Sequence, residues 1–233
     1  MALPKIDLPI SEIILPSSGE KVKYRPFSVA EEKVLLVAQE SGEAEQEVLA
    51  MKQIINNCLV DYDVEDLALF DFEYVYLILR SKSIDNVASF NVTDPDTKEK
   101  VQLEMDLTDI EFVRDDRHTK EIKINDDYTL FLKYPNIDEF IRIIGMDNED
   151  PLVNYFLMVS CLDTLASEDE VHNFADYSDK EVEDFMDGLT GDVVKEITTF
   201  FETMPKLRKE IKYTNKEGKE QTFVVEGTRS FFI

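Results

Sequence analysis

Short segments of alternating apolar and polar residues lie near the start of the chain, and a helical pattern follows them directly. Residues 13–15 and 22–24 flank a Ser-Ser-Gly turn, which predicts a β-hairpin. Ser28 and Glu31 then have the spacing of a capping box, in which each side chain bonds to the backbone of the other residue. The helix that they begin is expected to end at Gly42, since glycine accepts the left-handed conformation found at helix ends. A strand therefore leads straight into a capped helix.

Apolar residues at helical spacing predict further helices along the chain. The predicted segments are 48–59, 71–83 with Asp71 as the N-cap, 137–144 ending at Gly145, 152–162 beginning at Asp150-Pro151, the segment that follows a second capping box at Ser178 and Glu181, and 193–204. The segment 152–162 is apolar on nearly all sides, and this pattern predicts a buried helix rather than a surface helix.

Three more hairpins are predicted where the alternating pattern returns on both sides of turn-forming residues. They pair residues 88–92 with 101–105, 120–124 with 128–134, and 210–214 with 222–226. The predicted fold class is therefore α+β, with several β-hairpins, about six to seven helices and mostly antiparallel strands. We expect a single α+β domain over residues 1–233, because no Gly/Ser-rich or Pro-rich linker divides the chain. Two lobes, 1–135 and 136–233, are the alternative.

The charge of the chain limits its partners. The sequence holds 50 Asp and Glu against 25 Lys and Arg, a formal net charge of −25, while 43% of its residues are hydrophobic. The apolar share is typical of a folded core, and the negative charge disfavours nucleic acid and anionic membranes as partners. The acids either keep the protein soluble or match a basic partner surface. The basic residues of 206–209 are predicted to complement the C-terminal end of the preceding helix.

The acidic segment 166–192 has two interpretations. It holds ten acids and a single lysine. A solvated helix face explains such a segment, and mimicry of DNA is the alternative.

Cysteine use and the lack of long apolar runs indicate the compartment. Cys58 and Cys161 lie in apolar helical patterns far apart in the sequence, as expected of buried thiols in a reducing environment. The first residues lack the pattern of a signal peptide. The run from Leu152 to Leu162 is too short for a membrane span, which needs about 20 residues. We therefore expect an intracellular protein without a membrane partner.

The residue patterns of common active sites are missing from the sequence. Its seven glycines are scattered and form no phosphate-binding loop, and its two histidines and two cysteines lack the spacing of a zinc site. Residues 61–72 begin like a calcium loop, but Asp66 stands where the turn needs glycine and Phe72 where glutamate is needed. We predict no catalytic, cofactor-binding or metal-binding residue, no cofactor and no enzymatic activity. A metal-dependent hydrolase stays open, because 50 acids offer many carboxylate pairs.

Three sets of segments carry a resemblance to a known family. They are Leu3–Asp7 with Val22–Phe27 and Glu31–Lys33, then Lys52–Cys58 with Phe72–Tyr74 and Leu79–Lys82, and finally Phe200–Arg208 with the closing hairpin and Glu226-Gly227. Together they resemble the T-even-type phage baseplate hub assembly proteins. The resemblance implies a non-enzymatic protein, since family members are either subunits of the baseplate hub or assembly catalysts that leave the particle.

The resemblance also bears on metal binding. It implies paired cysteines in the hairpins of some family members. Here the hairpin tips read Asp94-Pro-Asp and Asn215-Lys-Glu-Gly and contain no cysteine, which puts any metal site of the family in doubt for this chain.

The resemblance and the charge together lead to a functional hypothesis. We expect a tail morphogenesis factor that acts as an assembly chaperone for the baseplate central hub by binding hub or tail proteins of the same phage. Its location would be the host cytoplasm during assembly, or the baseplate of the virion tail. A hub subunit retained in the virion is one alternative, and an acidic nucleic-acid mimic that binds a basic host protein is another. The oligomeric state is not predicted.

Two sets of residues are the candidates for partner binding, because aromatic residues and arginine often dominate interfaces. They are Tyr24, Arg25, Pro26 and Phe27 at the end of a strand, and Phe200, Phe201, Met204 and Leu207 around the last helix. Ordinary core packing is the alternative for both sets.

Overall fold

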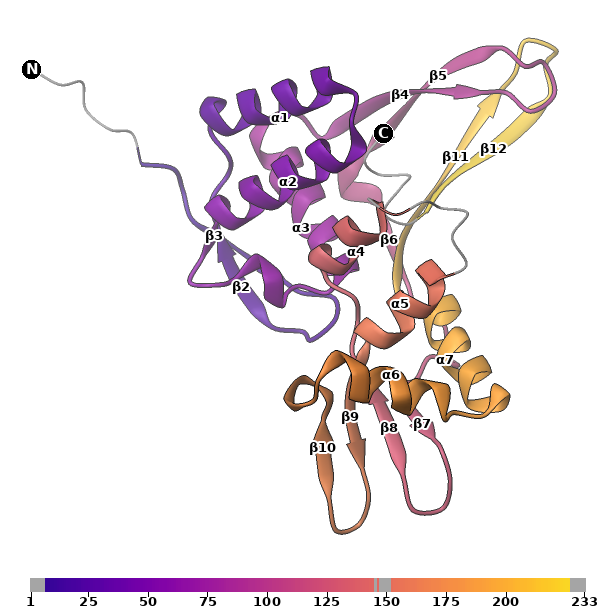
Figure 1. Ribbon diagram of the computed structural model, residues 1–233. Coiled ribbons are helices and arrows are strands. Elements are labelled where there is room, and N and C mark those ends of the chain that lie inside the picture. The colour runs from indigo at the N-terminus through magenta and orange to yellow at the C-terminus, as the bar shows by residue number, and fades with distance from the viewer. Residues whose placement is uncertain (1–6, 145, 147–151, 227–233) are drawn as a thin grey trace, which may run out of the picture. The chain divides into compact units, whose positions relative to one another are not determined.

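A computed structural model describes residues 7–144, 146 and 152–226 of the chain (Figure 1). Over these residues it contains seven α-helices and four small antiparallel sheets, which confirms the predicted α+β class. The chain packs as two compact units. Unit 1 comprises residues 1–113 and 206–233, and unit 2 comprises residues 114–205, so that unit 2 is an insertion in the sequence of unit 1. A single domain over the whole chain stays a prediction.

Unit 1 combines three helices with three small sheets. The helices are α1 Val29–Ser41, α2 Ala44–Cys58 and α3 Leu69–Ser83, with short 3₁₀ turns η1 Val64–Asp66 and η2 Leu107–Asp109. The strands are β1 Ser11–Ile14, β2 Lys21–Tyr24, β3 Leu59–Val60, β4 Val87–Thr93, β5 Lys100–Asp106, β6 Glu111–Val113, β11 Lys206–Thr214 and β12 Glu220–Glu226. They form sheets in the orders β1-β2-β3, β4-β5 and β12-β11-β6.

The first hairpin and the capped helix follow the sequence prediction. Ser11 pairs with Tyr24 across the β1–β2 hairpin. The capping box of Ser28 and Glu31 begins α1, and Gly42 ends it in the left-handed conformation with φ of 69°. A residue with a Cβ atom would be strained there, which explains the glycine.

The predicted N-cap of α3 is wrong. The helix begins at Leu69 with Ala68 as its N-cap, so Asp71 lies inside the first turn. Its carboxylate accepts hydrogen bonds from the backbone N–H and the hydroxyl of Ser17, in the turn of the first hairpin. A carboxylate in the first turn is also favoured by the helix dipole. Asp71 therefore joins α3 to a distant hairpin, which local sequence does not reveal.

The C-terminal part of the chain completes unit 1. Leu207 of β11 pairs with Phe112 of β6, next to the point where the chain leaves unit 1. This pairing corrects the interpretation of residues 206–209, which begin a strand and do not cap a helix. Their charges meet nearby carboxylates, as in the ion pair of Lys206 with Glu226 of β12 at 2.5 Å.

Side chains from one helix and four strands form a core of unit 1. Leu77 of α3, Ala88 of β4 and Met105 of β5 pack with residues of β11 and β12, including Leu207 and Val225. All five are nearly inaccessible to solvent. Unit 1 therefore depends on sequence from both ends of the chain.

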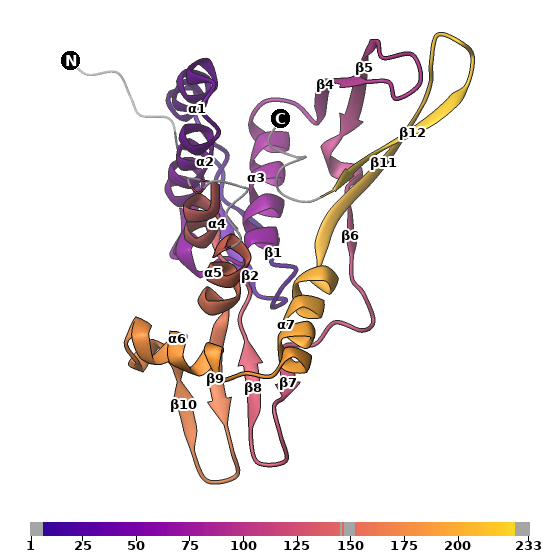
Figure 2. The ribbon, with the colours of Figure 1, turned by 45° about the vertical axis from the view of Figure 1, so that its right-hand side comes forward.

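Unit 2 is a four-stranded sheet combined with four helices. Its strands are β7 Glu121–Lys123, β8 Thr129–Leu132, β9 Leu162–Ala166 and β10 Val171–Asn173, in the order β10-β9-β8-β7 (Figure 2). Its helices are α4 Ile137–Ile144, α5 Leu152–Ser160, α6 Asp179–Asp187 and α7 Gly191–Thr203, with a 3₁₀ turn η3 Phe174–Asp176. The predicted capping box of Ser178 and Glu181 begins α6.

Two predictions for this unit are wrong. The apolar run 152–162 is not one buried helix, because α5 ends at Ser160, contains no fully buried residue, and is followed by strand β9 from Leu162. The acidic segment 166–192 is helical mainly over α6, since its first part forms the turn and second strand of the β9–β10 hairpin. Periodicity alone does not separate a buried strand from a helix in a short apolar run. The predicted signals at Gly145 and 150–151 lie outside the described residues.

The core of unit 2 joins the sheet to α6 and α7. Its buried members are Ile122, Leu130, Leu132, Leu162, Val182, Met186, Val193, Ile197 and Phe200. Phe200 is 2% exposed and is the largest of them, whereas Phe201 packs at the margin of the same cluster and is partly exposed.

Replacing Phe200 should therefore destabilise unit 2 strongly. We expect Phe200→Ala to lower the free energy of unfolding by about 3–5 kcal/mol, because it removes a buried ring and leaves a cavity. Phe201→Ala is the matched control and should cost less than half as much. Urea unfolding followed by circular dichroism measures both, since the chain has no tryptophan. Equal losses for the two variants would contradict the assignment of Phe200 to the core.

Candidate functional site

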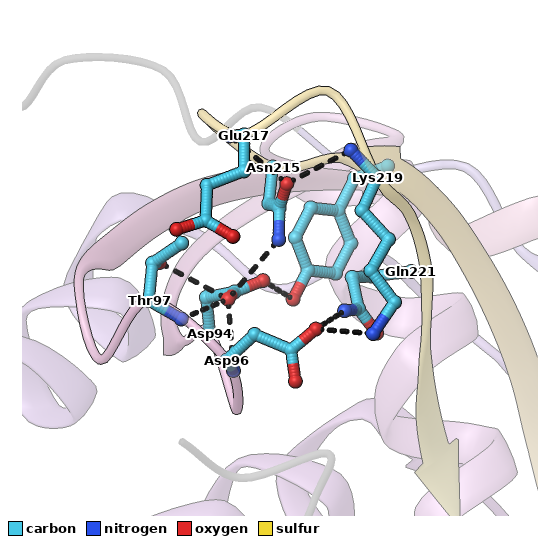
Figure 3. Close-up of polar contacts among 8 residues, drawn as sticks. Asp94, Asp96, Thr97, Asn215, Glu217, Lys219 and Gln221 are labelled. Atoms are coloured by element: carbon cyan, nitrogen blue, oxygen red, sulfur yellow. Dashed lines mark hydrogen bonds and ion pairs between the residues drawn. The ribbon is translucent and has the colours of Figure 1, made fainter.

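Two hairpins of unit 1 form the most elaborate polar site of the described residues. The β4–β5 and β11–β12 hairpins lie side by side in Figures 1 and 2, and we call them together the hairpin arm. Phe90 and Phe223 contact each other along it, with ring centroids 5.8 Å apart. The turns at the two tips, 94–99 and 215–219, meet at the end of the arm (Figure 3).

Asp94 is the centre of the tip contacts. Its Oδ1 accepts hydrogen bonds from the backbone N–H groups of Asp96 at 3.0 Å and Thr97 at 2.8 Å, and from the Thr97 hydroxyl at 3.0 Å. The Tyr213 hydroxyl donates to its Oδ2 at 2.8 Å, and the side-chain amide of Asn215 donates to Oδ1 at 3.5 Å. The Thr97 N–H, followed by the other donors, lowers the pKa of Asp94 to about 2. This fully covered carboxylate is therefore held as an anion.

Asn215 has the equivalent role in the second tip. Its side-chain oxygen accepts hydrogen bonds from the backbone N–H groups of Glu217 at 3.1 Å and Lys219 at 3.0 Å. Gly218 supports this turn with φ of 79°. Lys219 also donates to Asp96 of the other hairpin at 2.5 Å, and Gln221 donates to the same oxygen at 2.6 Å (Figure 3). Each tip is thus closed by its own side chain and bonded to its neighbour.

The tip contacts do not fit a metal ion. The oxygens of Asp94 face N–H and O–H donors, whereas a cation needs several acceptor atoms directed at one point. Across the described part of the chain, no group of three or more His, Cys, Asp or Glu side chains is arranged to hold a metal. The described contacts of the arm are therefore hydrogen bonds and ion pairs.

A second charged cluster joins β2 to α1. The guanidinium of Arg25 donates to both oxygens of Glu31, at 2.6 and 3.0 Å, and also to the Pro26 carbonyl. Ser28 donates to Glu31 from its backbone N–H at 2.6 Å and from its hydroxyl at 2.8 Å. The bond from Arg25 is the main cause that lowers the pKa of Glu31 to about 2. One carboxylate therefore fixes both the end of the strand and the start of the helix.

Comparison with known proteins identifies the family of this chain. The family described as T4 bacteriophage base plate protein matches residues 8–233. The chain belongs to this family. Neither a curated protein nor a solved structure matches it significantly. The resemblance to baseplate proteins is confirmed at this level, and kinship with the hub-specific subgroup stays a prediction.

The structure places half of the predicted partner-binding residues of this baseplate protein in its interior. Tyr24, Phe27 and Leu207 are buried in unit 1, and Phe200 is buried in unit 2. Arg25 is engaged in the ion pair described above. The remaining three residues, Pro26, Phe201 and Met204, are partly exposed. Residues 24–27 thus lie together at one strand–helix joint. Of the second set, Phe200, Phe201 and Met204 belong to unit 2 and Leu207 belongs to unit 1. Partner contact by these residues stays a prediction.

Both cysteines of the baseplate protein are buried, and His118 is held by hydrogen bonds within unit 2. Burial raises the pKa of both Cys58 and Cys161 to about 12, so neither is a reactive thiolate. His118 bonds to the Thr203 hydroxyl at 3.0 Å and to the Tyr134 hydroxyl at 2.9 Å, and burial lowers its pKa. It therefore acts as a neutral polar link within unit 2.

The sequence interpretation missed an apolar surface on α1. Val29, Leu36 and Val37 are 66%, 53% and 68% exposed, and Val34 is exposed as well. The available signal was the run of apolar residues from Val34 to Val37, which places apolar side chains on more than one face of a helix. Exposed aliphatic side chains grouped on one helix are common at protein contacts. Among the described residues, no helix is long and apolar enough to cross a membrane.

The ion pair of Glu31 gives a pH-dependent prediction. Its folded-state pKa lies below the unfolded value of 4.5, so its stabilisation is complete above pH 5 and is lost as the pH falls towards 2. Glu31→Gln should lower the free energy of unfolding by about 2–3 kcal/mol at pH 7. The difference from the wild type should shrink between pH 5 and pH 3.

The second capping box supplies the control. Glu181 makes the same bonds to Ser178, but no basic side chain is bonded to it in the contacts described for α6. Glu181→Gln should therefore have a smaller effect in the same urea titrations. An equal loss in both variants would show that capping alone, without Arg25, accounts for the stabilisation.

The contacts of Asp94 predict the rigidity of the hairpin arm. Asp94→Ala removes the carboxylate that accepts these hydrogen bonds, so the amide hydrogens of Asp96 and Thr97 should exchange at least about tenfold faster. Asp96→Ala, which removes only the exposed contacts with Lys219 and Gln221, should change exchange elsewhere in the arm far less. Hydrogen exchange followed by mass spectrometry measures both variants. Unchanged protection of the tips in Asp94→Ala would contradict the central role of this carboxylate.

Proposed function

We propose that this chain is a non-enzymatic assembly factor that helps to build the central hub of a phage baseplate by binding other baseplate proteins. The observation that carries the proposal is the family match over residues 8–233, which covers both units. Membership implies binding to other proteins of the same baseplate. The step from baseplate protein to transient hub chaperone is our inference.

The internal chemistry of the described residues supports a binding function. The thiols have raised pKa values, and the conspicuous carboxylates Asp94 and Glu31 are held by hydrogen-bond donors with low pKa values. Enzymes commonly shift the pKa values of such groups towards neutral pH to transfer protons. Here the pKa values are shifted away from neutral pH, as expected of buried neutral thiols and of structural carboxylate anions.

The net charge of −25 supports a chaperone more than a permanent subunit. Such a charge keeps the protein and its complexes soluble, and it favours rapid but salt-sensitive association with a basic surface. Both properties suit a protein that holds a subunit and then releases it. The hypothesis of a nucleic-acid mimic rests on charge alone, which the assembly function explains equally well.

The fate of the protein during infection tests this proposal. Quantitative mass spectrometry should find the chain abundant in the infected-cell lysate and nearly absent from purified mature particles. Hub proteins retained in the particle serve as the internal reference. A fixed small number of copies per particle would overturn the chaperone function in favour of a retained hub subunit.

A second measurement tests the assembly function itself. A stop codon in place of Gln39 removes nearly the whole protein, and we expect infected cells then to contain no complete baseplates by electron microscopy. The intact chain supplied from a plasmid should restore them. Normal baseplates without the chain would overturn any essential role in their assembly.

A further inference from the structure

A groove in unit 1 runs beside α1, between this helix, α3 and the β4–β5 hairpin. Glu32, Leu35, Leu36 and Gln39 form its α1 wall, at the spacing of one helix face. Its volume is about 290 Å³. All of its lining residues belong to unit 1, so the groove depends only on the packing of that unit.

The groove has an apolar floor, and its edges mix exposed aliphatic side chains with polar ones, among them Glu32, Gln39 and Arg80. Its floor consists of the buried side chains Leu35, Met51, Tyr76, Ala88, Met105 and Leu107. Leu36 on one edge is 53% exposed, and Ile84 near the C-terminal end of α3 is 49% exposed. Large aliphatic side chains so exposed around a concave surface are typical of a protein-binding site.

The apolar surface continues from the groove onto the outside of α1. Val29 precedes Leu36 by two turns of the helix, and Val37 is adjacent to Leu36; both are more exposed than Leu36. We call Val29, Leu36 and Val37 the exposed stripe of α1. This stripe and the groove together resemble the receptor side of a helix-in-groove contact, in which an amphipathic helix inserts its apolar face.

Negative charge beside the groove favours a partner with basic residues. Residues 29–47 contain six acids and one lysine. Glu32 lines the groove, while Glu40, Glu43 and Glu45 are exposed on α1 and at the start of α2. Glu32 and Arg80 balance each other in the lining, and Glu31 is paired with Arg25, so the acidic excess beside the groove comes from the exposed acids of residues 40–45. A second copy of the chain would bring another charge of −25, and repulsion makes it a poor occupant.

We propose that this groove, with the exposed stripe of α1, binds an amphipathic helix of another baseplate protein whose apolar face is flanked by Lys or Arg. This inference rests on the proposed function, because it takes the partner from the same baseplate. Leu36 and Ile84 contact the apolar face of the partner helix, and Glu32 and Glu40 meet its basic residues. The association weakens as salt rises, since the charged groups lie at the exposed edge.

Photo-crosslinking in infected cells tests the groove directly. The photo-reactive residue p-benzoylphenylalanine replaces Leu36 in one protein and Val171, which is 72% exposed on β10 of unit 2, in a control. We expect position 36 to capture a baseplate protein through a peptide that has apolar residues flanked by Lys or Arg. Capture of a second copy of this chain, of its own residues 227–233, or of nothing beyond the control would overturn the proposal.

Affinity measurements with the captured baseplate protein complete the test. The double variant Leu36→Ser, Ile84→Ser should bind at least about tenfold more weakly than the wild type, whereas Val171→Ser should bind equally well. Raising the salt from about 0.1 M to about 0.5 M should weaken the wild-type complex. Unchanged affinity of the double variant would overturn the groove assignment.

The two proposals fail in different ways. Capture of baseplate proteins at position 171 but not at 36 would leave the assembly function standing and remove the groove from it. Normal baseplates in cells that lack the chain would overturn the assembly function. A baseplate protein captured at position 36 would still support the groove, whereas capture of a protein from outside the baseplate would overturn the groove proposal as well.

Discussion

The pairing of β11 with β6 is the contact on which unit 1 depends. Unit 2 is inserted between these two strands, so the chain must return after 92 residues to complete the sheet and core that it left at Val113. Leu207 and Val225 complete the cluster begun by Leu77, Ala88 and Met105. Closing so long a loop costs entropy, but this cost grows only slowly with length, and the buried apolar surface offsets it. The hairpin arm rests on this closure, because β11 and β12 are half of it.

The large negative charge is compatible with the fold because the buried carboxylates are satisfied. Glu31 is held by Arg25 and Ser28, and Asp94 by the donors of both hairpin tips. The remaining excess is divided between the units. Unit 2 holds 23 acids and 8 bases, which leaves −15 of the total of −25 on 92 residues. Exposed acids at this density repel one another, so a basic partner would stabilise the protein as well as bind it.

The arrangement of the exposed residues favours recognition through surfaces over chemistry at a centre. Buried aromatic residues such as Tyr24 and Phe200 support the cores, while aliphatic residues of α1 remain in solvent beside a groove. A folded protein gains nothing in stability from exposed valine and leucine on one helix, so their place is better explained by a contact with another protein. This division is consistent with membership in a baseplate family, whose proteins function in an assembly.

The sequence by itself determined the elements whose causes are local. The capping boxes at Ser28 and Ser178, the stop at Gly42 and the four predicted hairpins all depend on residues a few positions apart, and all are present. Only the tertiary structure decided what depends on distant residues. The β9–β10 hairpin forms where β8 offers a neighbouring strand, and residues 206–208 pair with β6. Asp71 bonds to Ser17 of a distant hairpin from inside the first turn of α3. The sequence also does not decide which apolar side chains of a helix stay exposed. Its apolar pattern shows which faces could be buried, and only the tertiary structure shows which faces other parts of the chain cover.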